Sequence, residues 1–198
     1  MINKRIDKLK KNNLQIVFIS LVIIIAALSR MIPHPLNFAP MCAIALFGAS
    51  HFSNRWLGFI IPISATFLSD LFINNYIYQS ESFIISFNFW SYGSYLLIII
   101  FSLSLYKKNV SVFNLSVGAL GSSLIFYLIS NFGVWLTGAM YPLNFQGLVS
   151  CYTAAIPFFG NTLMSTCFYS FILFGGYYAV QKKNIILKPK NFSYSFGA

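Results

Sequence analysis

The scarcity of charged residues between Leu14 and Gln181 is the feature that most restricts how this chain can fold. Six charged residues occur in that stretch, namely Arg30, Arg55, Asp70, Glu81, Lys107 and Lys108. Over the whole chain 8% of residues are charged and 58% are hydrophobic, whereas about 25% of the residues of a soluble domain are charged. A water-exposed surface cannot be built from this composition. We therefore predict an all-α membrane protein in which residues 14–181 form a single transmembrane domain.

Six apolar runs divide this domain, and each predicts a membrane-spanning helix. They cover residues 14–29, 38–52, 56–73, 87–106, 112–132 and 155–180. As a helix, the second run would extend about 22 Å, which is less than the ~30 Å hydrocarbon core of a bilayer. It is therefore either a short span or a re-entrant segment that its neighbours bury. The pairs Ala39/Ala43 and Ala45/Ala49 in this run would let another helix approach closely.

The positions of the basic residues predict the orientation of this six-helix bundle. Residues 1–13 form a basic leader and residues 182–198 a basic tail. With six spans and a cytoplasmic N-terminus, twelve of the thirteen basic residues lie inside and only Arg30 lies outside, as the positive-inside rule requires. We expect both termini in the cytoplasm and a multi-pass protein of the inner (cytoplasmic) membrane. The net charge of +10 then reflects orientation, and nucleic acid is not an expected partner.

Two alternatives to this topology remain open at the level of the sequence. Four spans would result if residues 38–73 formed a buried hairpin. The basic leader before the first apolar run also resembles the start of a signal peptide, with Ala27-Leu28-Ser29 as a weak cleavage site. Cleavage there would deprive the next segment of its membrane partner, so the six-span arrangement is preferred.

The stretch from residue 131 to residue 161 joins the last two long apolar runs and has an unusual composition. It contains no Lys, Arg, Asp or Glu, but amides, aromatic residues and turn formers alternate through it. Such side chains suit an uncharged or weakly charged ligand at a membrane surface. The alternative is an interfacial loop with an aromatic belt, which membrane proteins of any function have.

The chain lacks the sequence patterns of membrane enzymes and metal sites. No HExxH motif occurs, no His or acidic pair is spaced to place two metal ligands on one helix face, and no Gly-rich phosphate loop is present. Cys42, Cys151 and Cys167 are scattered and read as small apolar residues. We therefore expect no enzymatic activity, no cofactor and no metal, and ATP would have to be used by partner proteins.

The predicted topology brings a set of amide, aromatic and charged residues to the outer side, where a ligand would bind. The candidate ligand-binding residues are Arg30, Asn37, Asp70, Trp90, Asn131, Trp135, Tyr141, Gln146, Tyr152 and Asn161. Several of them have structural alternatives. Arg30 could pair with a ligand carboxylate, but a salt bridge to Asp70 or a contact with a lipid headgroup is the preferred interpretation. Asn161 follows a proline in an apolar run, so its amide either caps freed backbone groups or binds ligand, and His34 is best read as an interfacial residue.

Several blocks of this sequence resemble an uncharacterised family of small bacterial membrane proteins. The blocks are Arg-Met-Ile-Pro-His-Pro-Leu-Asn-Phe-Ala-Pro and Ala-Leu-Phe-Gly-Ala within residues 30–49, Leu-Ser-Asp-Leu at 68–71, Ser-Asn-Phe-Gly-Val-Trp at 130–135, and Gly-Leu-x-x-Cys-Tyr-x-Ala-x-Ile-Pro-Phe-Phe-x-Asn at 147–161. The resemblance covers about residues 14–180. That family is usually grouped with the S components, the substrate-binding subunits of energy-coupling-factor (ECF) vitamin transporters.

The resemblance implies an S-component-like bundle of six transmembrane helices. A vitamin-like ligand would bind near the outer face, between the last three helices and the outer loops, and the early helices would dock on a membrane coupling subunit driven by separate ATPases. The first helix of S components carries a small-xxx-small docking motif. Here residues 14–28 lack a clear one, and the alanine spacings lie in the second run instead.

The resulting functional hypothesis is a substrate-capture subunit of a transporter, with membrane lipids, a small-molecule ligand and the coupling proteins as its partners. A structural or assembly protein of the cell envelope is the first alternative, and a self-contained small carrier is the second. An outer pocket lined by Trp135, Tyr152 and Asn161 would favour capture. A fully packed outer face would favour the structural role, and internal sequence symmetry would favour a carrier, but no clear repeat is visible.

Overall fold

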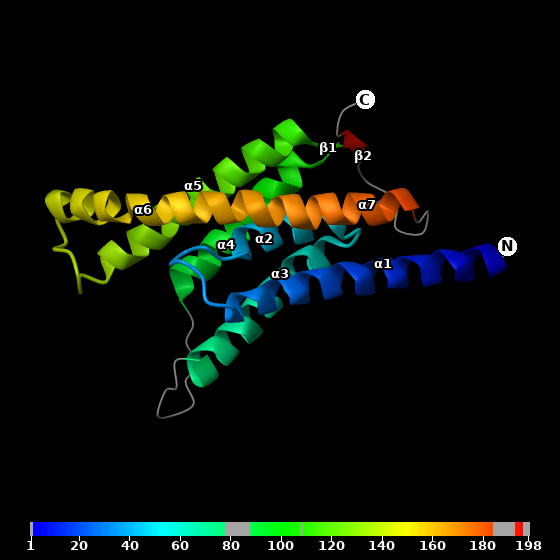
Figure 1. Cartoon of the computed structure of the whole chain (residues 1–198), viewed down its shortest axis with the longest axis horizontal. Coiled ribbons are helices and arrows are strands. Elements are labelled where there is room, and N and C mark those ends of the chain that lie inside the picture. Colours follow the sequence, from blue (N-terminus) through cyan, green and yellow to red (C-terminus); the bar gives the residue numbers. More distant parts are fainter. Residues whose placement is uncertain (1, 78–87, 108, 184–192, 196–198) are drawn as a thin grey trace.

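The chain folds into an elongated bundle of helices (Figure 1). The computed structural model describes residues 2–77, 88–107, 109–183 and 193–195, and Glu81, expected on the outer side, lies outside these residues. The helices are α1 (Ile2–Leu28), α2 (Met41–His51), α3 (Arg55–Phe72), α4 (Phe89–Leu105), α5 (Val112–Leu136), α6 (Phe145–Ser170) and α7 (Gly176–Lys183). A 3-10 turn (Ser29–Met31) follows α1, and π-helical turns follow α3 (Ile73–Ile77) and α6 (Phe171–Gly175). Two short strands, β1 (Asn109–Ser111) and β2 (Ser193–Ser195), pair in parallel.

Side-chain caps fix where four of these helices begin. Asn54, Asn88, Ser111 and Asn144 each accept a hydrogen bond from a backbone N–H in the first turn of α3, α4, α5 and α6, respectively. The first-turn N–H groups have no partner within their own helix, so a side-chain oxygen at this position stabilises the helix start by about 1 kcal/mol.

Helix α2 is the centre of the core. All but one of its eleven residues are buried, and it packs against α3, α4 and α6. Ile44, Leu46 and Phe47 are completely inaccessible to solvent. At about 16 Å this helix is shorter than the bilayer core, and its neighbours cover it on every side. The structure thus gives the second apolar run a helix that is short and enclosed by protein.

Four helical stretches of the described chain are long and apolar enough to cross a membrane. They are Lys10–Met31, Arg55–Ile77, Val112–Leu136 and Phe145–Lys183, whereas Met41–His51 and Phe89–Leu105 are shorter. Large apolar side chains cover much of the outside, including Phe171 at 78% exposed and Phe113 at 75%. Such a surface suits lipid and not water. The prediction of a helical membrane protein is confirmed at this level.

The close helix approach predicted for the second apolar run is present between α2 and α3. A Cβ atom added at Gly58 would lie 3.3 Å from the Cα of Ala49 and 3.3 Å from the carbonyl oxygen of Gly48. A Cβ added at Gly48 would overlap the ring of Pro62. The two backbones therefore pack against each other where α2 offers small residues.

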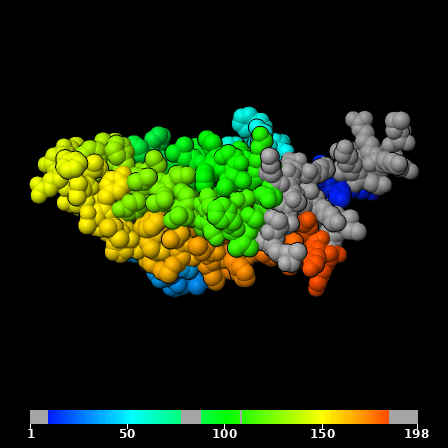
Figure 2. Space-filling model, turned by 90° about the horizontal axis from the view of Figure 1, so that it is seen from above, coloured from blue at the N-terminus to red at the C-terminus, as the bar shows by residue number. Residues whose placement is uncertain are grey.

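The stretch from residue 131 to residue 161 is mostly helical, which corrects the expectation of a long loop. Helix α5 continues to Leu136 and α6 already begins at Phe145, ten residues before the predicted sixth run. The connection is limited to residues 137–144, at one end of the molecule (Figure 2). Gly138 and Asn144 belong to this connection, but the other amides and glycines of the stretch lie within α5 and α6. A helix that packs against a neighbour tolerates such residues of low helix propensity.

Candidate ligand-binding site

A cavity of about 300 Å³ opens where the first connection, the end of α3 and the middle of α4, α5 and α6 meet. We call it the Arg30 cavity. Its lining residues are Arg30, His34, Leu36, Asn37, Ala39, Met41, Cys42, Asp70, Ile73, Asn74, Tyr95, Phe126 and Thr162. Its size is at the lower end of the range for sites that bind small organic molecules, and a few polar groups among apolar walls are typical of such sites.

An ion pair between Arg30 and Asp70 forms one wall of the Arg30 cavity. The Nη1 atom of Arg30 donates to Oδ1 of Asp70 at 2.6 Å and to the hydroxyl of Ser69 at 2.6 Å. The hydroxyl of Tyr92 donates to the other Asp70 oxygen at 2.6 Å. The salt bridge predicted from the sequence is therefore present. The pair is electrically neutral, and its two side chains are 17% and 21% exposed.

Another part of the lining combines aromatic rings with small polar groups. Tyr95 is buried, and its ring stacks on that of Phe126 with 5.6 Å between centroids and 10° between planes. The hydroxyl of Thr162 is used within α6, where it donates to the carbonyl of Phe158. This part of the lining is therefore mainly aromatic and apolar, in contrast to the charged pair.

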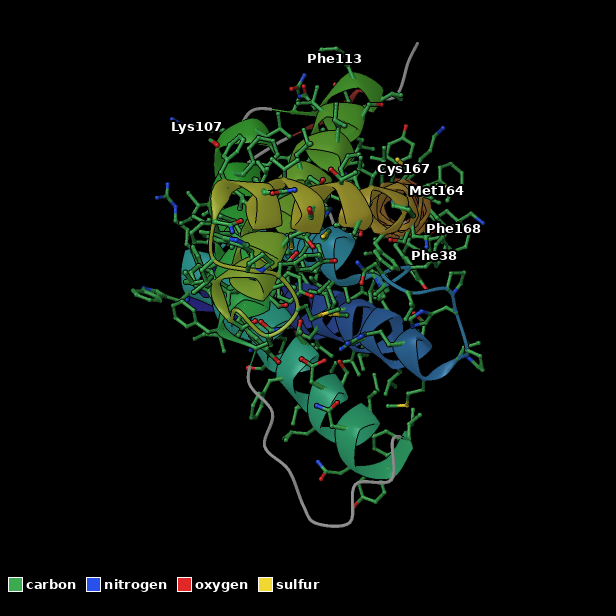
Figure 3. The ribbon with its side chains drawn as sticks, turned by 90° about the vertical axis from the view of Figure 1, so that its left-hand side faces the viewer. Phe38, Lys107, Phe113, Met164, Cys167 and Phe168 are labelled. Carbon is green, nitrogen blue, oxygen red and sulfur yellow. The ribbon has the colours of Figure 1, made fainter. Side chains whose placement is uncertain are left out.

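The connection between α1 and α2 covers the Arg30 cavity, and helix α6 holds it in place. The amide of Asn161 donates to the carbonyl of Leu36 at 2.9 Å, and the hydroxyl of Ser165 donates to the carbonyl of Ala39 at 3.2 Å. Phe38 packs against Phe168 of α6, with 6.2 Å between ring centroids (Figure 3). The Asn161 amide thus binds the backbone of this connection, which differs from both roles expected from the sequence, a cap within its own helix and a ligand contact.

Asn37 occupies an unusual backbone conformation within this connection. Its φ angle is +61°, a left-handed value that asparagine and glycine adopt far more readily than other residues. His34 lies nearby and is exposed, with Nδ1 3.0 Å from the carbonyl oxygen of Pro35. The turn thus presents the Asn37 side chain to the cavity that it lines.

A second cavity of about 310 Å³ lies next to the first, between the same connection and the α5–α6 end. We call it the Asn131 cavity. It is lined by Leu36, Asn37, Asn131, Val134, Met140, Tyr141, Cys151, Ala154, Ala155 and Phe158. Leu36 and Asn37 line both cavities. The predicted residues Arg30, Asn37, Asp70, Asn131 and Tyr141 are therefore gathered around two adjoining spaces.

The other five predicted residues lie outside these two cavities, so neither cavity is the pocket of Trp135, Tyr152 and Asn161 that was expected for a capture protein. Trp90 packs across α4 and α5, on Gly133 and on Phe132 at 5.4 Å between ring centroids. The indole of Trp135 donates to the carbonyl of Pro142 at 3.0 Å. The hydroxyl of Tyr152 donates to the carbonyl of Leu128 at 2.7 Å. Gln146 is exposed, and the Asn161 amide binds the connection between α1 and α2.

The cavity wall also contains residues that the sequence did not single out. Tyr95, Phe126 and Thr162 lie inside apolar runs, where their spacing is that of ordinary packed residues. Cys42, which the sequence predicts to be a small apolar core residue, is buried and lines the cavity. Only the three-dimensional contact of α4, α5 and α6 shows that these side chains share a space.

The Asn161→Ala protein is expected to be less stable by about 1 kcal/mol, because the Leu36 carbonyl loses its side-chain donor. The loss should appear as a lower unfolding midpoint in detergent and as faster hydrogen exchange in residues 32–40. Gln146→Ala is the matched control, since this side chain is exposed near the start of the same helix. Unchanged exchange in residues 32–40 would show that the Asn161 amide does not stabilise the connection.

Comparison with known proteins identifies a family but no characterised relative. The model of the "Family of unknown function (DUF6580)" matches residues 10–190. No curated protein matches the chain. No solved structure matches it either.

Proposed function

The chain belongs to DUF6580, a family of unknown function, and we propose that it is the substrate-capture subunit of a membrane transporter. It would bind a small vitamin-like molecule in the Arg30 cavity from the outer face, in the manner of the S components of ECF transporters. The observation that carries this proposal is the cavity itself, whose lining contains an ion pair, two stacked aromatic rings and Asn37. Cavities with this combination of groups commonly bind small organic molecules.

The ligand that fits this cavity is small and carries no net charge. Arg30 and Asp70 neutralise each other, so a strong anion would have to compete with the carboxylate of Asp70. A neutral or zwitterionic molecule can use the hydrogen-bonding capacity of the pair without breaking it. Its ring or alkyl part would lie against Tyr95 and Phe126.

The proposed topology has six membrane-crossing segments and cytoplasmic termini in the inner membrane. Helices α1 to α5 would each supply one segment, and the continuous stretch Phe145–Lys183 would supply the sixth. The start of α1 and helix α7 lie toward the same end of the molecule, which is compatible with both termini on one side (Figure 1). Helix α2 could serve as a short segment because protein surrounds it and no lipid reaches its backbone.

Transport by such a subunit would need partners that supply energy. The sequence carries no phosphate-binding loop, so a membrane coupling subunit with its own ATPases is the proposed source of driving force. The long exposed apolar surface of the bundle would meet membrane lipids and, on part of it, the coupling subunit.

A structural or assembly protein of the envelope is the second candidate. The observation in its favour is that Arg30, Asp70, Ser69 and Tyr92 satisfy one another without a ligand. A purely structural protein would retain no small molecule, so the two candidates differ in a measurable property.

Native mass spectrometry of the gently purified protein tests the proposal. We expect a co-purifying small molecule and expect Asn37→Gly to reduce its retention about tenfold, because this change removes the amide and leaves the positive φ angle available. Gln146→Ala, an exposed position outside both cavities, should retain the molecule. Absence of any bound molecule from the wild-type protein, or equal retention by Asn37→Gly, would reject capture in this cavity.

A further inference from the structure

A small hollow lies at the other end of the core from the Arg30 cavity. We call it the Arg55 hollow. Its volume is about 110 Å³, and it is lined by Ala49, Ser50, Phe52, Ser53, Arg55, Ser102, Leu103, Tyr106 and Lys107. It lies where the α2–α3 turn meets the end of α4. Arg55 and Asp70 are fifteen residues apart along α3, which corresponds to about 22 Å, so the hollow is separate from the proposed capture site.

Two positive side chains line the Arg55 hollow, and neither has an acidic partner among the described residues. Arg55 belongs to the first turn of α3, and Lys107 follows the end of α4; both are exposed. Asp70 is the one acidic residue whose side chain is described, and it is paired with Arg30. Two cations from different turns therefore converge on one hollow without a counter-charge from the described part of the chain.

Hydroxyl groups complete the polar lining of the hollow. Ser102 donates to the carbonyl of Leu46 at 2.8 Å, and Ser50 donates to the carbonyls of Leu46 and Phe47 at 3.0 Å each, so these two hydroxyls are already used. Ser53 is exposed, and within the described chain its hydroxyl has no hydrogen-bond partner. Two cations and a free hydroxyl around a small space are suited to an oxyanion.

The residues around the hollow indicate at which level of the membrane the oxyanion would bind. Trp56, next to Arg55, is 74% exposed, and Ile60, one turn further along α3, is 55% exposed. Tryptophan with neighbouring cations is typical of the level of lipid headgroups, and apolar residues beyond it face acyl chains. The basic turns also define the side of the membrane that attracts anionic lipids.

We propose that the Arg55 hollow binds a phosphate group, with Arg55 and Lys107 supplying the charge and Ser53 a hydrogen bond. The chemistry fits the phosphodiester of an anionic phospholipid headgroup, and a free phosphate presents the same oxygens. This site is independent of the proposed capture function, because its lining residues are all different from those of the Arg30 cavity.

The test measures thermal stability in detergent and lipid retention by native mass spectrometry, with phosphatidylglycerol, phosphatidylcholine or inorganic phosphate added. We expect selective retention and stabilisation by phosphatidylglycerol in the wild-type protein. Arg55→Gln combined with Lys107→Gln should weaken this binding about 30-fold, as expected for the loss of two charges at a membrane surface. Stabilisation by inorganic phosphate to the same extent would support the site and identify a free anion as its ligand.

Two matched variants separate this site from general surface charge. Lys182→Gln combined with Lys183→Gln removes two exposed basic residues from α7, and this protein should retain phosphatidylglycerol as the wild type does. Arg55→Lys combined with Lys107→Arg keeps both charges and should retain most of the binding. Equal binding of phosphatidylcholine, or equal losses in the two glutamine double variants, would overturn the proposal.

Discussion

The Gly147→Ala protein is expected to have a free energy of unfolding about 3 kcal/mol smaller than the wild type. Gly147 lies in the first turn of α6, where its N–H donates to the side chain of Asn144 at 2.8 Å. A Cβ atom there would overlap the carbonyl oxygen of Pro142. That oxygen is backbone and also accepts the hydrogen bond from the Trp135 indole, so it cannot move without disturbing the whole α5–α6 connection.

The measurement is the unfolding midpoint in detergent, followed by circular dichroism. Gly160→Ala is the matched control in the same helix, because a Cβ at Gly160 would meet no atom within 4 Å. Alanine is favoured over glycine in a helix by about 1 kcal/mol, so this control should be as stable as the wild type or slightly more stable. If both alanine variants unfolded at the same midpoint, the proposed close approach at Gly147 would be wrong.

The Asp70→Ala protein is expected to lose about 2 kcal/mol of stability. The change removes the acceptor of both Arg30 and Tyr92 and leaves a guanidinium without its partner. Breaking a fully buried ion pair costs about 3–5 kcal/mol. The expected value here is lower because the two side chains remain 17% and 21% exposed, so water can solvate Arg30 in part.

A double-mutant cycle separates this ion pair from simple loss of packing. Arg30→Met combined with Asp70→Leu replaces both charges with apolar side chains of comparable size, and we expect it to be more stable than Asp70→Ala alone. Unfolding midpoints of the single and double variants give the coupling energy. A coupling energy near zero would show that the ion pair does not contribute to stability.

The sequence predicted the parts of this structure that depend on charge and local chemistry. The lack of charged residues across residues 14–181 indicated apolar helices, and four stretches long enough to span a membrane are present. The Arg30–Asp70 salt bridge could be anticipated, because a lone carboxylate in an apolar run needs a partner. The small residues of α2 indicated a close helix neighbour, because small side chains let two helix backbones approach each other.

The parts that the sequence did not predict depend on long-range packing. Asn144 and Gly147 looked like loop residues, but the first caps α6 and the second fits beneath the connection that precedes it. Thr162 and Tyr95 have the spacing of ordinary core residues, and their place beside a cavity follows from how α4, α5 and α6 come together. The sequence therefore located the candidate site through its two charged residues and its amides, but it did not identify much of the cavity lining.

Helix α2 has a mechanical consequence, because it lines a space at each of its ends. Met41 and Cys42 belong to the Arg30 cavity, while Ala49 and Ser50 belong to the Arg55 hollow. An enclosed helix of three turns moves as a rigid rod, so a tilt or axial shift of α2 that widens one space alters the other. If both proposed sites bind their ligands, such a shift would make each bound molecule change the affinity for the other by the same factor.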